Sequence, residues 1–356
     1  MLRADSEYFE IETPVKFVAQ VRDLLIDLQT VKPWIYWTDF LLTSAVLYAT
    51  LWVSCTASIG SMVWCVAVVI CSAASFRAVV FTHEIAHRRP GQLRGFSLAW
   101  NMLCGIPFLI PSFLYWDHRC HHIYPSYGTP SDAEYLFLRD RRALRALIFL
   151  LLPLTFPLLS MLRFFLMTPL ALSSRRMDQR IWQRASSLYF MNLLYLREYD
   201  ASAHARARWI QEVSCFLWAW TVVGLLVAGT IPLTAAASIY LLSVLWMFVN
   251  QVRTLVAHRY ASHGESMSYT QQILDSYTFP YGVLPELWAP LGMRYHALHH
   301  VSPSLPYHAM HRAHRRLMRD LPADSPYRKT IQNTPWSALR RTIAGDLLRI
   351  ENQDAR

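Results

Sequence analysis

The sequence has few charged residues for its length. Only 16% of its 356 residues are Asp, Glu, Lys or Arg, and 54% are hydrophobic, whereas a soluble domain carries roughly 25% charged residues. No Gly-x-Gly-x-x-Gly stretch for a dinucleotide occurs among its 11 glycines. The six cysteines form no Cys-x-x-Cys pair, which argues against a disulfide framework, a cysteine-based zinc site, an iron–sulfur cluster or a c-type haem. The low charged fraction and the high hydrophobic fraction together exclude an ordinary soluble enzyme.

Lysine is nearly absent, because only Lys16, Lys32 and Lys329 occur among the 34 basic residues. With 24 acidic residues the formal net charge is +10. A basic membrane protein is expected to contact anionic lipid headgroups or an acidic protein partner. Residues 1–33 hold no basic region followed by an apolar run, so a cleaved signal peptide is not expected.

Long apolar runs dominate the chain. There are six of them, each close to the ~20 residues with which a helix crosses a bilayer. The first two runs are joined by Thr56-Ala57-Ser58 and the last two meet at Ile231-Pro232, so each of these pairs predicts a helical hairpin. The six runs are 34–55, 59–81, 95–116, 147–171, 213–231 and 233–252.

Arginine between the runs indicates the topology. Neither hairpin turn contains Lys or Arg, whereas every other connecting segment is rich in arginine, and such segments tend to lie in the cytoplasm. The runs 95–116 and 147–171 would then have both ends in the cytoplasm, so each must return or lie at the interface. Proline interrupts both runs, and Arg163 in the second is costly in hydrocarbon unless it reaches an interface. The interrupting residues are Gly105, Pro107, Pro111, Pro153, Pro157 and Pro169.

The expected fold is an all-α integral membrane protein. Four transmembrane helices form two hairpins, and two re-entrant or interfacial helices and a cytoplasmic cap complete the domain. This single membrane-embedded domain is expected over residues 34–320. Residues 1–33 are expected to form a cytoplasmic N-terminal segment, and residues 321–356 a polar C-terminal tail with a short helix around 336–349.

Histidines are grouped in three boxes. His83-x-x-x-His87 follows the second run, and its spacing puts both imidazoles on one helix face. The two other boxes repeat the spacing i, i+3, i+4, so two or three rings of each box can converge on one point. They are His118-x-x-His121-His122 and His296-x-x-His299-His300.

All three boxes fall on the expected cytoplasmic face. Eight neutral nitrogen donors without cysteine suit a first-row metal such as iron or zinc, and they exceed the needs of one ion. The boxes therefore predict two metal ions at the membrane surface. Two redox metals in such a site can activate dioxygen against a substrate that lives in lipid.

With these boxes the chain resembles the membrane fatty acid desaturase and hydroxylase superfamily. Its phrases 253–260 and 292–308 are most similar to bacterial members, and the resemblance spans roughly residues 30–320. It implies a di-iron centre, dioxygen as co-substrate, a lipid or acyl-chain substrate and a bacterial inner membrane. It favours a desaturase that introduces a double bond, with a hydroxylase as the alternative, because both reactions begin with abstraction of an unactivated hydrogen.

The resemblance also implies a ninth histidine ligand between the last span and the third box. His258 matches this position, because it lies just beyond the final apolar run. His263 is a weaker candidate. The other histidines lie among arginines and are expected at the surface: His204, His308, His311 and His314.

The acidic and the aromatic residues near the boxes each have two possible roles. A metal-bound imidazole usually donates its other N–H to a carboxylate or carbonyl, although the carboxylates could equally pair with nearby arginines. These carboxylates are Glu84, Asp117, Asp132 and Glu134. Aromatic side chains near the boxes could line a substrate channel or belong to an interfacial belt, and they are Trp116, Tyr124, Trp288 and Tyr295.

Two other functions fit part of the pattern. His83-Glu84-x-x-His87 also matches zinc proteases, in which Glu is the general base, but an intramembrane metalloprotease would leave the two other boxes without a role. A transporter would need ionisable groups inside the spans, and the four hairpin spans hold little beyond Ser, Thr and Asn250, with Arg77 and Arg253 close to their cytoplasmic ends.

Electrons must come from another protein, because no redox cofactor motif is present. An external donor such as a ferredoxin-like protein with its reductase is expected, and an acidic donor would dock on arginines near the boxes. Binding of lipid headgroups explains these arginines equally well. They are Arg139, Arg141, Arg142, Arg312, Arg315 and Arg316.

Overall fold

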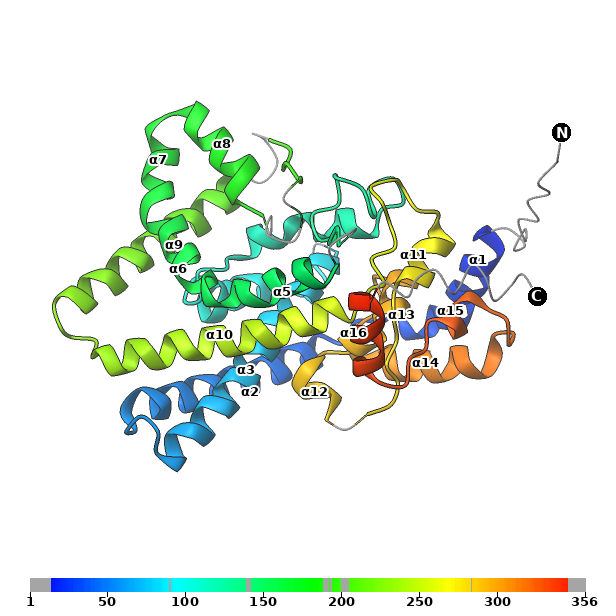
Figure 1. Cartoon of the computed structure of the whole chain (residues 1–356), viewed down its shortest axis with the longest axis horizontal. Coiled ribbons are helices and arrows are strands. Elements are labelled where there is room, and N and C mark those ends of the chain that lie inside the picture. Colours follow the sequence, from blue (N-terminus) through cyan, green and yellow to red (C-terminus); the bar gives the residue numbers. More distant parts are fainter. Residues whose placement is uncertain are drawn as a thin grey trace.

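The computed structural model describes residues 14–89, 91–138, 142–187, 192, 194–199, 205–282 and 284–344. Within these ranges the regular elements are helices, joined by two isolated β-bridges, His258 with Ser276 and Thr278 with Ile331. Two long helical hairpins extend toward one end of the molecule, and a cap of short helices forms the other end (Figure 1). The predicted all-α class is thus confirmed for the described residues.

The first hairpin consists of α2 (Pro33–Thr56) and α3 (Met62–His87). Proline begins α2, where its missing N–H costs nothing. The hydroxyl of Ser61 accepts from the backbone N–H of Trp64 and caps α3. Phe40 and Phe81 pack edge to face between the two helices, with ring centroids 5.4 Å apart.

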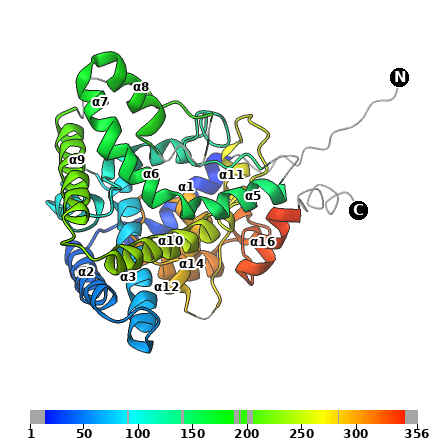
Figure 2. The same cartoon turned by 60° about the vertical axis from the view of Figure 1, so that its left-hand side comes forward.

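The second hairpin consists of α9 (Ala205–Val227) and α10 (Leu233–Leu255). Gly229 turns the chain with φ +69°, and Pro232 precedes α10. The two hairpins meet where α10 packs against α2 and α3, as Figure 2 also shows. The end of α10 thereby comes close to the end of α3, which carries the first histidine box.

The run 95–116 is broken as predicted. It forms the short helix α4 (Phe96–Trp100), a π-turn η2 (Asn101–Gly105), a loop and the first part of the 3₁₀ helix η3 (Ser112–His122). The side chain of Asn101 donates to the hydroxyl of Ser112 and accepts from the Ser112 backbone N–H, both at 2.9 Å. These bonds fold the run back on itself and aim η3 toward the cap.

The run 147–171 is also broken, but it departs from the prediction. Helix α5 (Arg142–Leu151) ends at the turn η5 (Leu152–Leu154). From there α6 (Phe156–Leu162), the π-turn η6 (Arg163–Met167) and α7 (Thr168–Ser173) form one stretch of 18 residues. The described residues thus contain five helices that are long and apolar enough to cross a membrane. This is one more than the four crossing helices predicted, because the π-turn continues the helix where an interruption was expected.

Its position in this run led us to expect that Arg163 reaches an interface, but it does not. Its side chain is buried and donates to both carboxylate oxygens of Glu212 on α9, at 2.6 and 3.0 Å. Thr168 and Ser186 complete the hydrogen bonds around this ion pair. A buried pair of this kind avoids the cost of an isolated charge, and it ties η6 to α9.

The cap contains α1 (Pro14–Leu25), η1 (Ile26–Leu28) and the helices after α10. The N-terminal segment and the C-terminal tail, which were expected to flank the domain, both contribute described residues to the cap. Val21 and Leu25 of α1 pack with buried Leu317 and Tyr327, and Ala338 near the C-terminus is fully buried. The cap helices after α10 are α11 (Tyr269–Asp275), α12 (Pro285–Trp288), η7 (Met293–Tyr295), α13 (His296–Val301), α14 (Tyr307–Asp320), α15 (Pro326–Lys329) and α16 (Pro335–Ala344). Outside the cap, α8 (Arg175–Ala185) lies beside α7.

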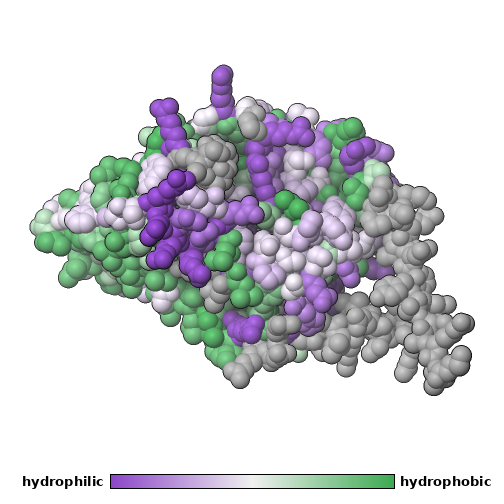
Figure 3. All heavy atoms as spheres, turned by 90° about the horizontal axis from the view of Figure 1, so that it is seen from above, coloured by the Kyte–Doolittle hydropathy of each residue, from purple (hydrophilic) through white to green (hydrophobic). Residues whose placement is uncertain are grey.

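Apolar side chains cover the outside of the hairpins. Trp52, Val69 and Leu217 are 69%, 66% and 58% exposed. Figure 3 shows hydrophobic residues gathered at the end that holds the hairpins, while hydrophilic residues gather over the middle of the molecule. Such faces need lipid to cover them, and the protein is an integral membrane protein.

Candidate metal centre

The three histidine boxes meet inside the cap. The first box lies in the last turn of α3, the second ends η3, and the third forms most of α13. His258 follows the end of α10, at the bridge to Ser276. Seven of these nine histidines are buried, and His87 and His122 are partly buried.

The nine histidines form two groups of possible metal ligands. Within each group one nitrogen of every ring lies within 4.8 Å of the corresponding nitrogens of the others. The larger group contains five histidines and the smaller group four. The larger group is His83, His87, His118, His122 and His299; the smaller group is His121, His258, His296 and His300.

Each His-x-x-His-His box contributes to both groups. His118 and His122 join the larger group while His121 joins the smaller one, and the third box divides in the opposite sense. In an α-helix, i and i+4 are about 40° apart around the axis, whereas i+3 and i+4 are about 100° apart. In the third box, which forms most of the α-helix α13, the i, i+4 pair can therefore converge on one point while the histidine between them turns to another.

Ring nitrogens approach each other closely in both groups. The Nε2 atom of His258 lies 2.8 Å from that of His296 and 3.1 Å from that of His121. In the larger group the Nε2 of His122 lies 3.1 Å from those of His118 and His299. Two nitrogens that each bind one metal ion at ~2.0–2.1 Å are about 3 Å apart when their bonds are at right angles. The observed separations thus fit the sharing of one cation by each group.

The protonation of the rings agrees with this fit. Burial, followed by the charge of neighbouring histidines, holds the pKa of His299 well below its usual value, and the same causes act on His122, His296 and His300. Neutral imidazoles are the form that binds metal. Several nitrogens in the groups have no hydrogen-bond partner among the described residues, including both nitrogens of His83. A cation would satisfy the lone pair of one nitrogen of His83 and that of the unpartnered Nε2 of His87.

Two carboxylates hold rings of the second box. The Nδ1 of His121 lies 2.9 Å from one oxygen of Asp132, and the Nδ1 of His118 lies 2.8 Å from Glu134. These contacts leave the Nε2 atoms directed into the two groups. Burial, the largest single cause, lowers the pKa of His121, but the charge and hydrogen bond of Asp132 together with the charges of Glu134 and Asp275 outweigh it and raise that pKa. Asp132 and Glu134 therefore contact box histidines as one of the two readings predicted.

The two other carboxylates have different partners. Asp117 pairs with Arg197 at 3.0 Å, so the arginine reading holds for it. Glu84 is buried, accepts from the hydroxyl of Tyr36 and lies 3.7 Å from Arg88. Its carboxylate is 3.9 Å from the Nδ1 of His83. Held in this way, Glu84 is not available as the general base that a zinc protease requires.

The environment of His258 includes residues that sequence reasoning missed. The hydroxyl of Tyr127 lies 2.9 Å from the Nδ1 of His258 and donates to Asp275 at 2.8 Å. Ser276 also approaches this Nδ1, at 3.2 Å. These side chains come from a loop after η3 and from the end of α11. No motif marks them, because they meet His258 only through the folding of the cap.

The remaining described histidines lie outside both groups. His263 and His311 are exposed, and the Nδ1 of His311 lies 2.7 Å from the Tyr295 hydroxyl. His314 is buried against the Tyr327 hydroxyl at 2.7 Å, which differs from the surface position expected for it. His308 is partly buried and accepts from the backbone N–H of Lys32. His204 lies outside the described residues.

The arginines expected to dock an electron donor are in different situations. Arg312 and Arg315 are exposed on α14. Arg316 pairs with Asp27, and Arg142 donates to the backbone carbonyls of Arg259 and Tyr260. Arg139 and Arg141 lie outside the described residues.

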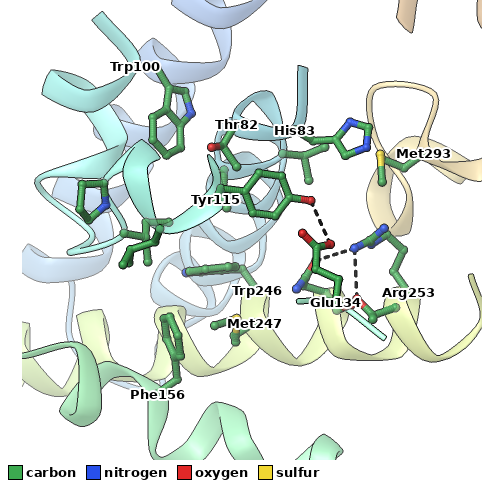
Figure 4. A pocket seen from close by; sticks show the side chains of 17 residues that line it. Thr82, His83, Trp100, Tyr115, Glu134, Phe156, Trp246, Met247, Arg253 and Met293 are labelled. Carbon is green, nitrogen blue, oxygen red and sulfur yellow. Dashed lines mark hydrogen bonds between the residues drawn. The ribbon is translucent and has the colours of Figure 1, made fainter. Parts of the chain in front are cut away.

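A cavity of about 100 Å³ reaches the larger histidine group. One water needs ~10–15 Å³, so there is room for several atoms of a substrate. His83 lines the cavity, and Figure 4 shows Tyr115, Glu134 and Arg253 around its polar end. The aromatic residues predicted to line a channel do not line this cavity, whose aromatic lining is Trp100, Tyr115, Phe156 and Trp246.

Fold and site together define a membrane enzyme with a buried cluster of nine histidines at the ends of apolar helices. The chain matches the fatty acid desaturase family over residues 59–331. A ceramide hydroxylase of Caulobacter vibrioides (strain NA1000 / CB15N) is 36% identical to it over 337 residues, which cover 94% of each chain. No solved structure matches the chain.

The chain belongs to the fatty acid desaturase family and is an oxidoreductase. The resemblance identified from the histidine boxes is thereby confirmed. The metalloprotease interpretation was wrong, since His83 and His87 share their group with three further histidines and Glu84 is bound elsewhere.

Proposed function

We propose that the protein is a di-iron, dioxygen-dependent hydroxylase of a ceramide or a closely related long-chain lipid. The observation that carries this proposal is the 36% identity to a ceramide hydroxylase over 94% of both chains. Desaturation, which the family name suggests, is the second candidate. Both reactions attack an unactivated carbon–hydrogen bond, so the geometry of the histidines is compatible with either.

The nine histidines would hold the two iron ions. His83, His87, His118, His122 and His299 would bind one ion, and His121, His258, His296 and His300 the other. When bound, the iron pair supplies the activation of dioxygen that oxidation of such a carbon requires. The different number of histidines leaves the smaller group more room for oxygen or water, and it is the larger group that meets the cavity through His83.

The chain itself would orient the substrate and the ligands. Apolar walls from α3, α4 and α10, such as Val79, Trp100 and Met247, would hold an acyl chain and exclude water from the reacting carbon. Asp132 and Glu134 would fix the rings of His121 and His118 through their Nδ1 atoms. These contacts order the two imidazole rings in the folded protein before the substrate binds.

We further propose that the chain crosses the membrane four times, with the histidines on the cytoplasmic face of the inner membrane. An even number of crossings must separate the second box from His258, because His121 contacts His258. Helices α9 and α10 account for two crossings, and a complete crossing by the stretch from α6 to α7 would add a third. That stretch is therefore re-entrant or interfacial in this topology.

The membrane-embedded domain would extend over residues 34–320, with α1, α15 and α16 packed against its cap. Electrons would reach it from an external donor such as a ferredoxin-like protein with its reductase. The exposed Arg312 and Arg315 supply a positive surface for an acidic donor.

The test is lipid analysis of cells that express the protein, compared with cells that do not. Purified protein in nanodiscs, with iron, dioxygen, a ferredoxin, its reductase and a ceramide, should give the same product. Gain of one oxygen atom by the ceramide supports hydroxylation, and loss of two hydrogens would replace it by desaturation. Unchanged ceramide under conditions in which the iron is reduced and reoxidised would contradict the proposed substrate.

A further inference from the structure

Arg253 is the only arginine that lines the cavity beside His83, among the residues the structure describes. It lies in the last turn of α10, five residues before His258. Figure 4 shows it at the polar end of the cavity, together with Glu134 and Tyr115. Many of the other lining residues are apolar, such as Val80, Trp246 and Phe156.

The guanidinium of Arg253 has few partners. Its Nη2 donates to the neutral side chains of Asn250 at 3.3 Å and Thr254 at 3.1 Å. Its Nε is buried without a hydrogen-bond partner among the described residues. A guanidinium carries five N–H donors, so most of this hydrogen-bonding capacity is unused in the structure.

No carboxylate of the described residues lies within ion-pair distance of Arg253. Glu134, the one carboxylate lining the cavity, is in contact with the Nδ1 of His118 at 2.8 Å and accepts from Tyr115 at 3.4 Å. Buried arginines are ordinarily paired, as Arg163 is with Glu212 and Arg208 with Asp178 in this chain. Arg253, which is partly buried and faces the cavity, has no such partner among the described residues. Arg259 also has no carboxylate at ion-pair distance there, but it donates to the backbone carbonyls of Leu274 and Lys329 instead.

We infer that Arg253 binds an oxygen of the substrate's polar group, such as the amide carbonyl or a hydroxyl of a ceramide, and so selects the carbon that is oxidised. This inference rests on the proposed function, since it concerns the substrate of that site. An oxygen acceptor in the cavity would receive the free N–H groups, in a low-dielectric surrounding that strengthens the bond. Arg253 is thus a residue that determines specificity and position, while the histidines provide the reaction.

The size of the cavity adds a consequence for the position of attack. Arg253 and His83 line the same small cavity, so a substrate oxygen bound to Arg253 places the carbons only a few bonds away next to the larger histidine group. The chain would therefore be oxidised near its polar end and not at a distant position along the tail.

Binding to iron-loaded, dioxygen-free protein in nanodiscs tests this inference separately from catalysis. The probes are a ceramide, hexadecanamide and hexadecane, and the variants are Arg253→Met and Arg253→Lys, with Arg180→Gln on exposed α8 as a matched loss of charge. Iron content and thermal unfolding are measured for each variant to establish that it is folded. Wild-type protein is expected to bind hexadecanamide more tightly than hexadecane.

Arg253→Met should weaken binding of the ceramide and of hexadecanamide by about ten- to a hundredfold, the effect of one hydrogen bond to a charged group. Binding of hexadecane should not change, and Arg253→Lys should retain part of the preference. In turnover, Arg253→Met should raise KM and give several positional products where wild type gives one.

Equal binding of hexadecanamide and hexadecane by wild type would overturn the role of Arg253. So would equal losses for both probes in Arg253→Met. Failure of wild type to oxidise a ceramide that it binds in an Arg253-dependent way would instead contradict the proposed hydroxylation and leave this inference standing.

Discussion

The Nε2 atoms of His121 and His258 lie 3.1 Å apart, although 137 residues separate them in the chain. His121 comes from the end of η3 and His258 from the segment after α10. Their contact joins the second box to the second hairpin and fixes both on one side of the membrane. It also brings into the smaller group the one histidine that lies outside the three boxes.

The first prediction concerns His258. Its removal leaves the smaller group with three histidines, so His258→Ala protein should bind substantially less iron than wild type and lose turnover. His311→Ala is the matched control, because His311 is exposed, lies outside both histidine groups and has its Nδ1 against the Tyr295 hydroxyl. Iron is measured by elemental analysis of purified protein. Full iron content with normal turnover in His258→Ala would remove this residue from the ligands.

The second prediction concerns Asp132. Its carboxylate is fully buried and contacts the Nδ1 of His121 through both oxygens, at 2.9 and 3.0 Å. Loss of such a contact typically costs about 10–100-fold in metal affinity, so Asp132→Asn should release iron to a chelator at correspondingly lower chelator concentration. The exposed Glu265→Gln should behave as wild type. Equal chelator resistance in both variants would show that the contact does not support metal binding.

Local patterns made the boxes and the hairpins predictable. Apolar runs of the length of a bilayer and the i, i+4 spacing are properties of neighbouring residues, and α2, α3, α9 and α10 follow them. His258 could be named only because of a family resemblance. The division of each box between two groups was not predicted, since it depends on where the cap places the partner rings.

Contacts between distant segments account for the rest. Tyr127 comes from a loop after η3 and Asp275 from the end of α11, where they meet beside His258, and nothing in their own neighbourhood marks them. Arg163 was expected to reach an interface, whereas a glutamate 49 residues later pairs with it and the helix continues through a π-turn. A pattern search along one segment cannot find such a partner.

The third prediction concerns topology. Reporter fusions after Thr56 and after Pro232 should report a periplasmic position, and a fusion after Ser173, at the end of α7, should report the cytoplasm. The reason is the contact of His121 with His258, which needs an even number of crossings between them. A periplasmic signal after Ser173 would mean that the stretch from α6 to α7 crosses the membrane, and that α9 or α10 does not.

The fourth prediction concerns the acid stability of the cap. Burial, together with the nearby charges of His311 and Arg294, lowers the pKa of His314 to about 4, and its Nδ1 lies 2.7 Å from the Tyr327 hydroxyl. The unfolded chain takes up this proton near its ordinary pKa of ~6.5. Stability should therefore be complete above about pH 6.5 and fall as the pH decreases toward 4.

The variant His314→Phe isolates this contribution. It should be less stable than wild type at neutral pH, because the contact with Tyr327 is lost, yet its Tm should fall less steeply between pH 6.5 and 4. His263→Phe, at an exposed position, should retain the wild-type slope. Identical slopes for wild type and His314→Phe would exclude His314 as a source of the acid sensitivity.

The last prediction concerns electron delivery. Arg312 and Arg315 are exposed on α14, and α14 packs against η7, which directly precedes His296. An acidic donor on this surface would be attracted over the Debye length, which is ~10 Å at 0.1 M salt and ~3 Å at 1 M. With a reduced acidic ferredoxin, KM for the donor should rise with salt in wild type. The double variant Arg312→Gln and Arg315→Gln should have a raised KM for the donor at low salt and little further response to added salt.

The double variant Arg175→Gln and Arg176→Gln on α8 is the control, because it removes the same exposed charge from another part of the molecule (Figure 1). It should keep the wild-type salt response. If both double variants respond alike, the donor does not dock on α14.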